Sequence, residues 1–190
     1  MSTSPSRPLR RDAERNRRLI IDTAKRLFAE RGLQVTLDEI AQSSGLGVGT
    51  VYRRFPNREA LVGALFADRV EEVLALSRRA AEAEPPAAAF RDLITELARL
   101  HAEDRGLRDV LLADDRAGDQ FAAALRRLRP LFRTVLARAQ TDGSLRPDLT
   151  VDDLPVLMSM IGTAADRAGP DWPRYLDLIM NGLRTSGGTR

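Results

Sequence analysis

The residues best suited to chemistry lie in one short stretch, GLGVGTVYRRFPNREAL, from Gly45 to Leu61. Its glycines would let a backbone come close to a phosphate, and its threonine and tyrosine hydroxyl groups could donate to phosphate oxygens. Its arginines could bind phosphate or read the O6 and N7 atoms of guanine. Together these residue types favour contact with DNA.

Two helices are predicted before the Gly45–Leu61 stretch. Apolar residues recur with helical spacing between Leu19 and Phe28, which predicts a first helix over about residues 12–31. Thr36 and Glu39 have the spacing of a capping box, so a second, short helix should begin directly after Thr36 and end at Gly45.

The stretch itself should contain a third helix of about two turns, because Gly45 precedes it and Pro56 stops it. Val51 and Phe55 are four residues apart and should form its buried face. Two short helices joined by a tight turn behind a longer helix make a helix-turn-helix, in which the second short helix enters the major groove.

The rest of the chain also reads as helices. Asn57 should cap a long fourth helix, and Pro130 should kink or break a later one. Thr150 and Asp171 should cap the last two, at about residues 151–168 and 172–185. No run alternates with period two for long enough to predict a strand, so we expect an all-α fold of about nine helices. The predicted domains are a disordered basic arm (1–11), a helix-turn-helix DNA-binding domain (12–56), a helical ligand-binding and dimerisation domain (57–185) and a flexible tail (186–190).

Composition disfavours most enzymatic chemistry. The chain of 190 residues has no cysteine, which excludes disulfides and thiolate nucleophiles, and its one histidine, His101, is too few for a histidine-based metal cluster. We therefore expect no cofactor. The longest uncharged, proline-free run, VLMSMIGTAA, is about half of a membrane span, and no signal peptide is visible. We expect a cytoplasmic protein with no membrane partner.

Positive charge is concentrated in the N-terminal third of the chain. Residues 1–60 hold 12 Lys or Arg against 7 Asp or Glu, whereas residues 61–190 hold 18 against 20. The overall net charge of +3 alone says little, but this distribution would draw a polyanion to the predicted helix-turn-helix.

The run TLDEIAQSSGLGVGTVYRRFPNREAL, residues 36–61, resembles the N-terminal signature of TetR-family transcriptional regulators, and the resemblance extends from Leu19 to Leu65. It implies three DNA-binding helices, a linking fourth helix and a helical body. The positions that match phosphate contacts are Thr36, Gly49, Thr50, Tyr52 and Arg58. The positions that match base-facing residues are Val48, Arg53 and Arg54. The Arg53-Arg54 pair replaces a more usual His and aromatic pair, so the operator sequence does not follow from relatives.

The resemblance also implies a homodimer formed through the last two helices, a palindromic double-stranded DNA operator and a small-molecule effector. Candidates for the effector site are the bulky or adaptable residues on predicted inner faces. They are Phe66, Phe90, Leu97, His101, Leu111, Phe121, Phe132, Met158 and Trp172. Ordinary core packing accounts for each of them better than ligand contact does.

The leading interpretation is a dimeric, sequence-specific repressor released by an effector. One alternative is an architectural DNA-binding protein, although such proteins usually carry more net charge than +3. The other is a small helical enzyme that uses the acid pairs Asp114-Asp115 or Asp152-Asp153. Residues adjacent in a helix do not face each other, which disfavours an enzyme.

Overall fold

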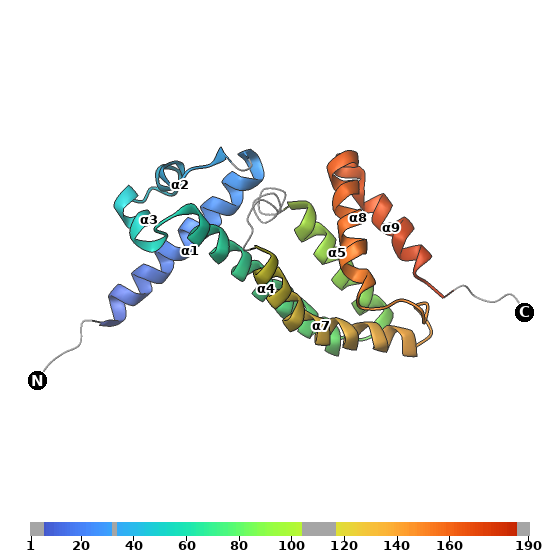
Figure 1. Cartoon of the computed structure of the whole chain (residues 1–190). Coiled ribbons are helices and arrows are strands. Elements are labelled where there is room, and N and C mark those ends of the chain that lie inside the picture. The colour runs from blue at the N-terminus through green and yellow to red at the C-terminus, as the bar shows by residue number, and fades with distance from the viewer. Residues whose placement is uncertain (1–5, 32–33, 104–116, 186–190) are drawn as a thin grey trace, which may run out of the picture. The chain divides into compact units, whose positions relative to one another are not determined.

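A computed structural model describes residues 6–31, 34–103 and 117–185 of the chain (Figure 1). The described residues form eight α-helices and a short 3₁₀ helix, and their only strand-like feature is an isolated antiparallel bridge between Leu145 and Arg184. The predicted all-α class is confirmed. The helices are α1 (Ser6–Arg31), α2 (Leu37–Ser44), α3 (Val48–Arg54), α4 (Arg58–Glu82), α5 (Pro86–Glu103), α7 (Ala117–Thr141), α8 (Asp153–Ala168), η2 (Gly169–Asp171) and α9 (Trp172–Gly182). The remaining expected helix, at about residues 107–111, lies outside the described residues, as does the tail at 186–190.

Among the described residues, the chain divides into two compact units within α4, between Arg69 and Val70. The predicted domain boundary at residues 56 and 57 falls earlier. The difference arises because the first turns of α4 pack into the first unit through Leu61 and Leu65, both buried in its core.

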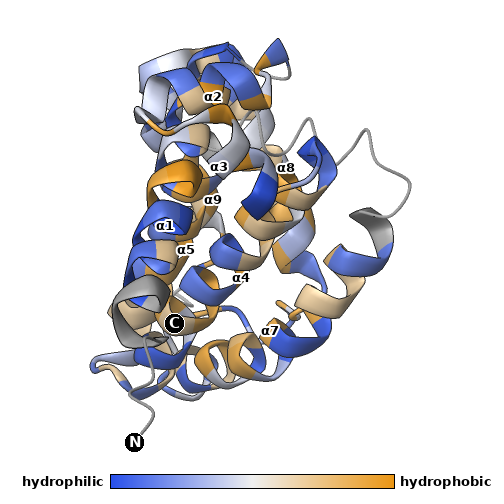
Figure 2. Cartoon of the chain, turned by 90° about the vertical axis from the view of Figure 1, so that its left-hand side faces the viewer, coloured by the Kyte–Doolittle hydropathy of each residue, from blue (hydrophilic) through white to orange (hydrophobic). Residues whose placement is uncertain are grey.

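The core of the first unit joins α1, α2, α3 and the start of α4. Its buried residues are Ile20, Ile21, Ala24, Leu27, Phe28, Val35, Leu37, Ile40, Ala41, Val51, Phe55, Leu61, Val62 and Leu65. Figure 2 shows hydrophobic and hydrophilic residues interspersed along the helices, as expected for amphipathic helices. Burial of a large apolar side chain contributes about 1.5–3 kcal/mol, so this cluster fixes how the short helices sit on α1.

The predicted ends of α2 are confirmed. The Thr36 hydroxyl accepts a hydrogen bond from the Glu39 backbone N–H at 3.2 Å, and the Thr36 N–H donates to the Glu39 carboxylate at 2.8 Å. Gly45 ends the helix with a left-handed φ of 69°, a conformation that glycine adopts without steric cost. The next helix, α3, therefore starts in a direction fixed by local sequence.

The beginning of α4 is also as predicted. The Asn57 side-chain oxygen accepts a hydrogen bond from the Ala60 backbone N–H at 2.9 Å. Phe55, the C-cap residue of α3, is buried in the first core. The helix α3 is thus held at both ends, by Gly45 before it and by Phe55 and Asn57 after it.

Residues 6–11 of the predicted arm lie in the first turns of α1, which begins at Ser6. Pro8 does not prevent this, since it stands in the first turn, where backbone N–H groups have no helical partner. Further along, the pairs Asp12–Arg15 (3.2 Å) and Glu14–Arg18 (3.4 Å) have the spacing that supports a helix. Residues 1–5 of the predicted arm lie outside the described residues.

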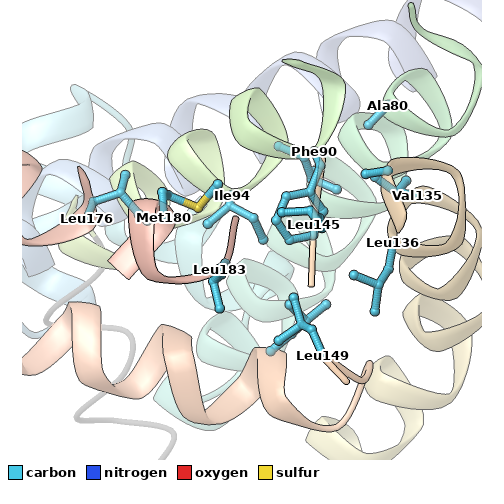
Figure 3. Packing of buried hydrophobic residues seen from close by; sticks show 14 of the residues in the cluster. Ala80, Phe90, Ile94, Val135, Leu136, Leu145, Leu149, Leu176, Met180 and Leu183 are labelled. Atoms are coloured by element: carbon cyan, nitrogen blue, oxygen red, sulfur yellow. The ribbon is translucent and has the colours of Figure 1, made fainter. Parts of the chain in front are cut away.

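The core of the second unit gathers residues from α5, α7, α8 and α9 around Phe90 and Ile94 (Figure 3). Leu145 and Leu149, from the loop after α7, close one side of this cluster. The helix α7 runs continuously through Pro130, so the predicted alternative of a break there is wrong.

The last two helices are shorter than predicted. The N-cap of α8 is Asp152, not Thr150, and the Thr150 hydroxyl and N–H both donate to the Asp153 carboxylate at 2.7 Å. The helix α9 ends at Gly182 rather than near residue 185, because the Thr185 N–H bonds to the carbonyl of Ser144 at 3.2 Å.

Across the described ranges, no helix is long and apolar enough to cross a membrane. Within the same ranges, His, Asp and Glu side chains do not gather in threes as a metal site would require.

Candidate nucleic-acid interface

The exposed face of α3 is defined by its buried face. Val51 is fully buried and Phe55 nearly so, which points this side of the helix into the first core. Since successive residues of an α-helix are rotated by about 100°, Gly49 and Arg53 lie on the side opposite Val51. Both are exposed. The middle of the exposed face of α3 therefore consists of the bare backbone at Gly49 and the guanidinium of Arg53. We call this the outward centre of α3.

One flank of α3 carries Val48 and Tyr52, both exposed. The carboxylate of Asp38 in α2 acts on the hydroxyl of Tyr52. The negative charge of Asp38 raises the pKa of the Tyr52 phenol, together with desolvation and hydrogen bonding to the same carboxylate. The phenol thus keeps its proton and stays a donor, which is the form that could bind a phosphate oxygen.

The other flank of α3 carries Thr50 and Arg54. Arg54 reaches the carboxylate of Glu14 in α1 at 3.8 Å. The guanidinium of Arg53 donates to the Thr50 hydroxyl at 3.1 Å. In the free chain the polar side chains of α3 are therefore already engaged, and DNA would have to exchange these contacts for its own.

Thr36 and Arg58 have structural contacts beside the expected DNA contact. The Thr36 hydroxyl belongs to the capping box of α2, and it also donates to the Glu39 carboxylate at 3.0 Å. The guanidinium of Arg58 lies over the ring of Phe28, 5.5 Å from its centroid, in a cation–π arrangement. Replacing either residue would disturb the first core as well as any DNA contact.

The structure thus brings the eight predicted DNA-binding residues together in one unit, on α3 and at the starts of α2 and α4. Sequence reasoning missed Asp38 and Glu14, the two carboxylates that hold the flanks of α3. Glu14 is far from Arg54 in sequence, and no local pattern links them.

The residues predicted to line an effector site are only partly brought together. Phe90 is buried in the second core, and four of the others pack against that core half-buried: Leu97, Phe132, Met158 and Trp172.

The other four predicted lining residues lie elsewhere. Phe66 belongs to the first unit, His101 is half-buried near the end of α5, and Leu111 lies outside the described residues. Phe121 is 51% exposed, because the start of α7 leaves it outside the core. The prediction that Phe121 lies on an inner face is therefore wrong for the single chain.

Helices α8 and α9 carry exposed apolar residues although they pack against each other and against the second core. On α8 these are Val156 (61% exposed) and Met160, one turn apart, and on α9 they are Tyr175 and Leu178 (57% exposed). Large apolar side chains at helical spacing on two neighbouring helices are typical of a surface that another protein covers.

Two family models match the chain. Residues 20–65 match bacterial regulatory proteins of the tetR family, and residues 85–185 match the C-terminal domain of SbtR-like transcriptional regulators. The first match covers the helix-turn-helix, and the second covers most of the second unit.

Solved structures of similar fold are transcription regulators. A TetR transcription regulatory protein from Mycobacterium vanbaalenii is 34% identical, with a TM-score of 0.72 over 93% of this chain and 99% of that one. A TetR transcriptional regulator from Streptomyces coelicolor is 29% identical, with a TM-score of 0.71 over 90% of this chain and 99% of that one.

Among curated proteins, an HTH-type transcriptional regulator of Staphylococcus aureus (strain USA300) is 39% identical over 54 residues. That match covers 28% of this chain and 29% of the relative, so the chain spans less than a third of the curated relative it matches. The likeness to this relative is therefore limited to a short segment.

Proposed function

Since the chain belongs to the TetR family of transcriptional regulators, we propose that it is a sequence-specific repressor that binds a palindromic operator as a homodimer. A small-molecule effector would release it from the DNA. We expect it to act in the cytoplasm, without catalytic activity. The observation that carries the proposal is the outward face of α3, where Arg53 and Gly49 stand opposite the buried Val51.

On DNA, α3 would lie in the major groove, whose width of about 12 Å matches a helix with its side chains. Arg53 would then meet base edges, whereas Val48 lies on the flank that carries Tyr52. Tyr52 and Thr50, on the flanks, would donate to backbone phosphates, as would Thr36 and Arg58 at the neighbouring helix ends. The absence of a side chain at Gly49 would let the helix approach closely.

The exposed apolar residues of α8 and α9 support the proposed dimer. A two-fold axis through this surface would place the same helices of two chains against each other and bury Val156 and Leu178. A two-fold symmetric protein carries two reading helices, so its operator should be a palindrome.

The second core supports an effector site within the body. Leu97, Phe132, Met158 and Trp172 surround the buried Phe90 and are only partly buried themselves. An effector would release DNA only if it bound the DNA-incompetent arrangement more tightly, since equal affinity shifts no equilibrium. Regulators of this family often respond to small molecules.

Selection of bound sequences from a random duplex pool, at physiological salt, tests the proposal. Recovery of a two-fold symmetric motif, with a sedimentation mass of twice 21.0 kDa, would support it. Binding without a motif that collapses as salt rises would instead indicate an architectural protein that holds DNA through counterion release. Monomeric protein at micromolar concentration would contradict the dimer.

A further inference from the structure

Two arginines from different helices share one carboxylate at the edge of α3. Glu14 of α1 lies 3.4 Å from Arg18 through one oxygen and 3.8 Å from Arg54 of α3 through the other. All three side chains are at least 41% exposed. An incoming anion could therefore reach both guanidinium groups.

This cluster adds little to the fold. The described side chains of α1 ahead of Ile20 include none that is buried, and exposed ion pairs contribute little to stability. The pair between Glu14 and Arg54 joins the N-terminal part of α1 to the reading helix α3. The two cations and one anion of the cluster leave a net positive charge beside the proposed interface.

The chemistry of the cluster suits a phosphate. Guanidinium groups bind carboxylate and phosphate with the same planar pairs of hydrogen bonds, so the Glu14 carboxylate occupies a place that a phosphate could take. Arg54 stands about 60° around the helix from the buried Val51, whereas Arg53 stands on the opposite side. With Arg53 over base edges, a side chain on this flank faces the sugar–phosphate wall of the groove.

We propose that a DNA backbone phosphate displaces Glu14 and binds between Arg18 and Arg54. Glu14 is then an internal competitor that weakens binding to every duplex, and Arg54 contacts the backbone rather than a base. This inference rests on the proposed function, because it takes α3 to lie in the major groove.

The test compares Glu14→Gln with Glu30→Gln. Glu30 is a matched control, since it lies on the same helix, is similarly exposed (51% against 49%) and forms an (i, i+4) pair with Arg26 at 3.3 Å. Dissociation constants are measured by fluorescence anisotropy for the selected operator and for a scrambled duplex. We expect E14Q to tighten binding to both duplexes by about threefold to tenfold relative to E30Q, the size expected from releasing two exposed ion pairs.

The partner arginine gives a second readout. Arg18→Ala should lower the slope of log affinity against log salt by about 0.9, the value for one lost phosphate contact, whereas Arg26→Ala should leave it unchanged. In the R18A background, E14Q should keep only the part of its advantage that comes from releasing Arg54. Circular dichroism melting checks that each variant folds.

The failure of this inference differs from the failure of the proposed function. Wild-type protein that selects a motif, while E14Q behaves as E30Q does, would overturn the phosphate site and leave the repressor proposal intact. An Arg54→Ala variant that loses one base preference without a change in salt slope would also overturn it. If wild-type protein binds no duplex even at low salt, the proposed function itself fails.

Discussion

Replacing Arg53 tests whether the outward centre of α3 reads bases. Its guanidinium can form two hydrogen bonds to guanine, and such a pair discriminates against the wrong base by about 1–3 kcal/mol. The bond to the Thr50 hydroxyl at 3.1 Å must first be exchanged. We therefore expect Arg53→Ala to lose the lower part of that range, about 1–2 kcal/mol or roughly fivefold to thirtyfold in discrimination.

Arg53→Lys separates the charge of Arg53 from its geometry. Lysine keeps the positive charge but lacks the planar fork, so R53K should lose most of the discrimination and keep the wild-type salt slope. The assay is competition binding of the selected operator against duplexes with single base-pair changes, repeated over a series of salt concentrations. Arg26→Ala, an exposed change on α1, should leave both quantities unchanged.

Two outcomes would refute the reasoning about Arg53. If R53K discriminates between base pairs as well as the wild type does, the fork of Arg53 does not read a base. If R53A keeps the full motif but its salt slope falls by about 0.9, Arg53 binds a phosphate, and the reading residue lies elsewhere on α3.

Four further changes test the cap of α2, the turn after it, the backbone of α3 and the dimer. Hydrogen bonds from Thr36 lower the pKa of Glu39 from its ordinary value of 4.5. The ionised Glu39 carboxylate therefore stabilises the folded state above pH 4.5, and this contribution is lost as the pH falls through the lower folded-state pKa. The melting temperatures of the wild type and Glu39→Gln should converge on acidification. Gly45→Ala, at a φ of 69°, should lower the free energy of unfolding in urea by about 1 kcal/mol. Gly49→Ala, with open space around it in a helix, should raise that free energy by up to about 1 kcal/mol while weakening DNA binding. Leu178→Glu should give a sedimentation mass near 21.0 kDa, and a persistent dimer would locate the interface elsewhere.

The parts of the fold that follow from adjacent residues could be predicted from the sequence. Each predicted cap or turn is formed by hydrogen bonds between residues no more than four positions apart. These are the capping box of Thr36 and Glu39, the turn at Gly45 and the cap at Asn57. The burial of Val51 and Phe55 follows in the same way from their spacing. The caps and the turn at the two ends of α3 are therefore encoded locally.

The parts that depend on distant residues could not be predicted. Thr185 ends α9 early by bonding Ser144, which is distant in sequence. Phe121 has the spacing of a core residue, but the packing of α7 leaves it exposed. The spacing of residues along the chain predicts a helix and its apolar face. Contacts with residues distant in sequence decide where the helix ends and which side chains are buried.

The consecutive residues Tyr52, Arg53 and Arg54 form one polar patch in sequence but face three directions in the structure. Since each step along a helix turns by about 100°, Tyr52 is directed to Asp38 of α2 and Arg54 to Glu14 of α1, while Arg53 points away from the core. The two flanking side chains are thus held by carboxylates of the same unit, and the central one is held by a neutral hydroxyl. Arg53 can exchange the neutral Thr50 hydroxyl for a DNA base at a lower cost in free energy than Arg54 can exchange the charged Glu14 carboxylate. We therefore expect base reading to depend on Arg53, and the flanking side chains to determine the affinity for any duplex.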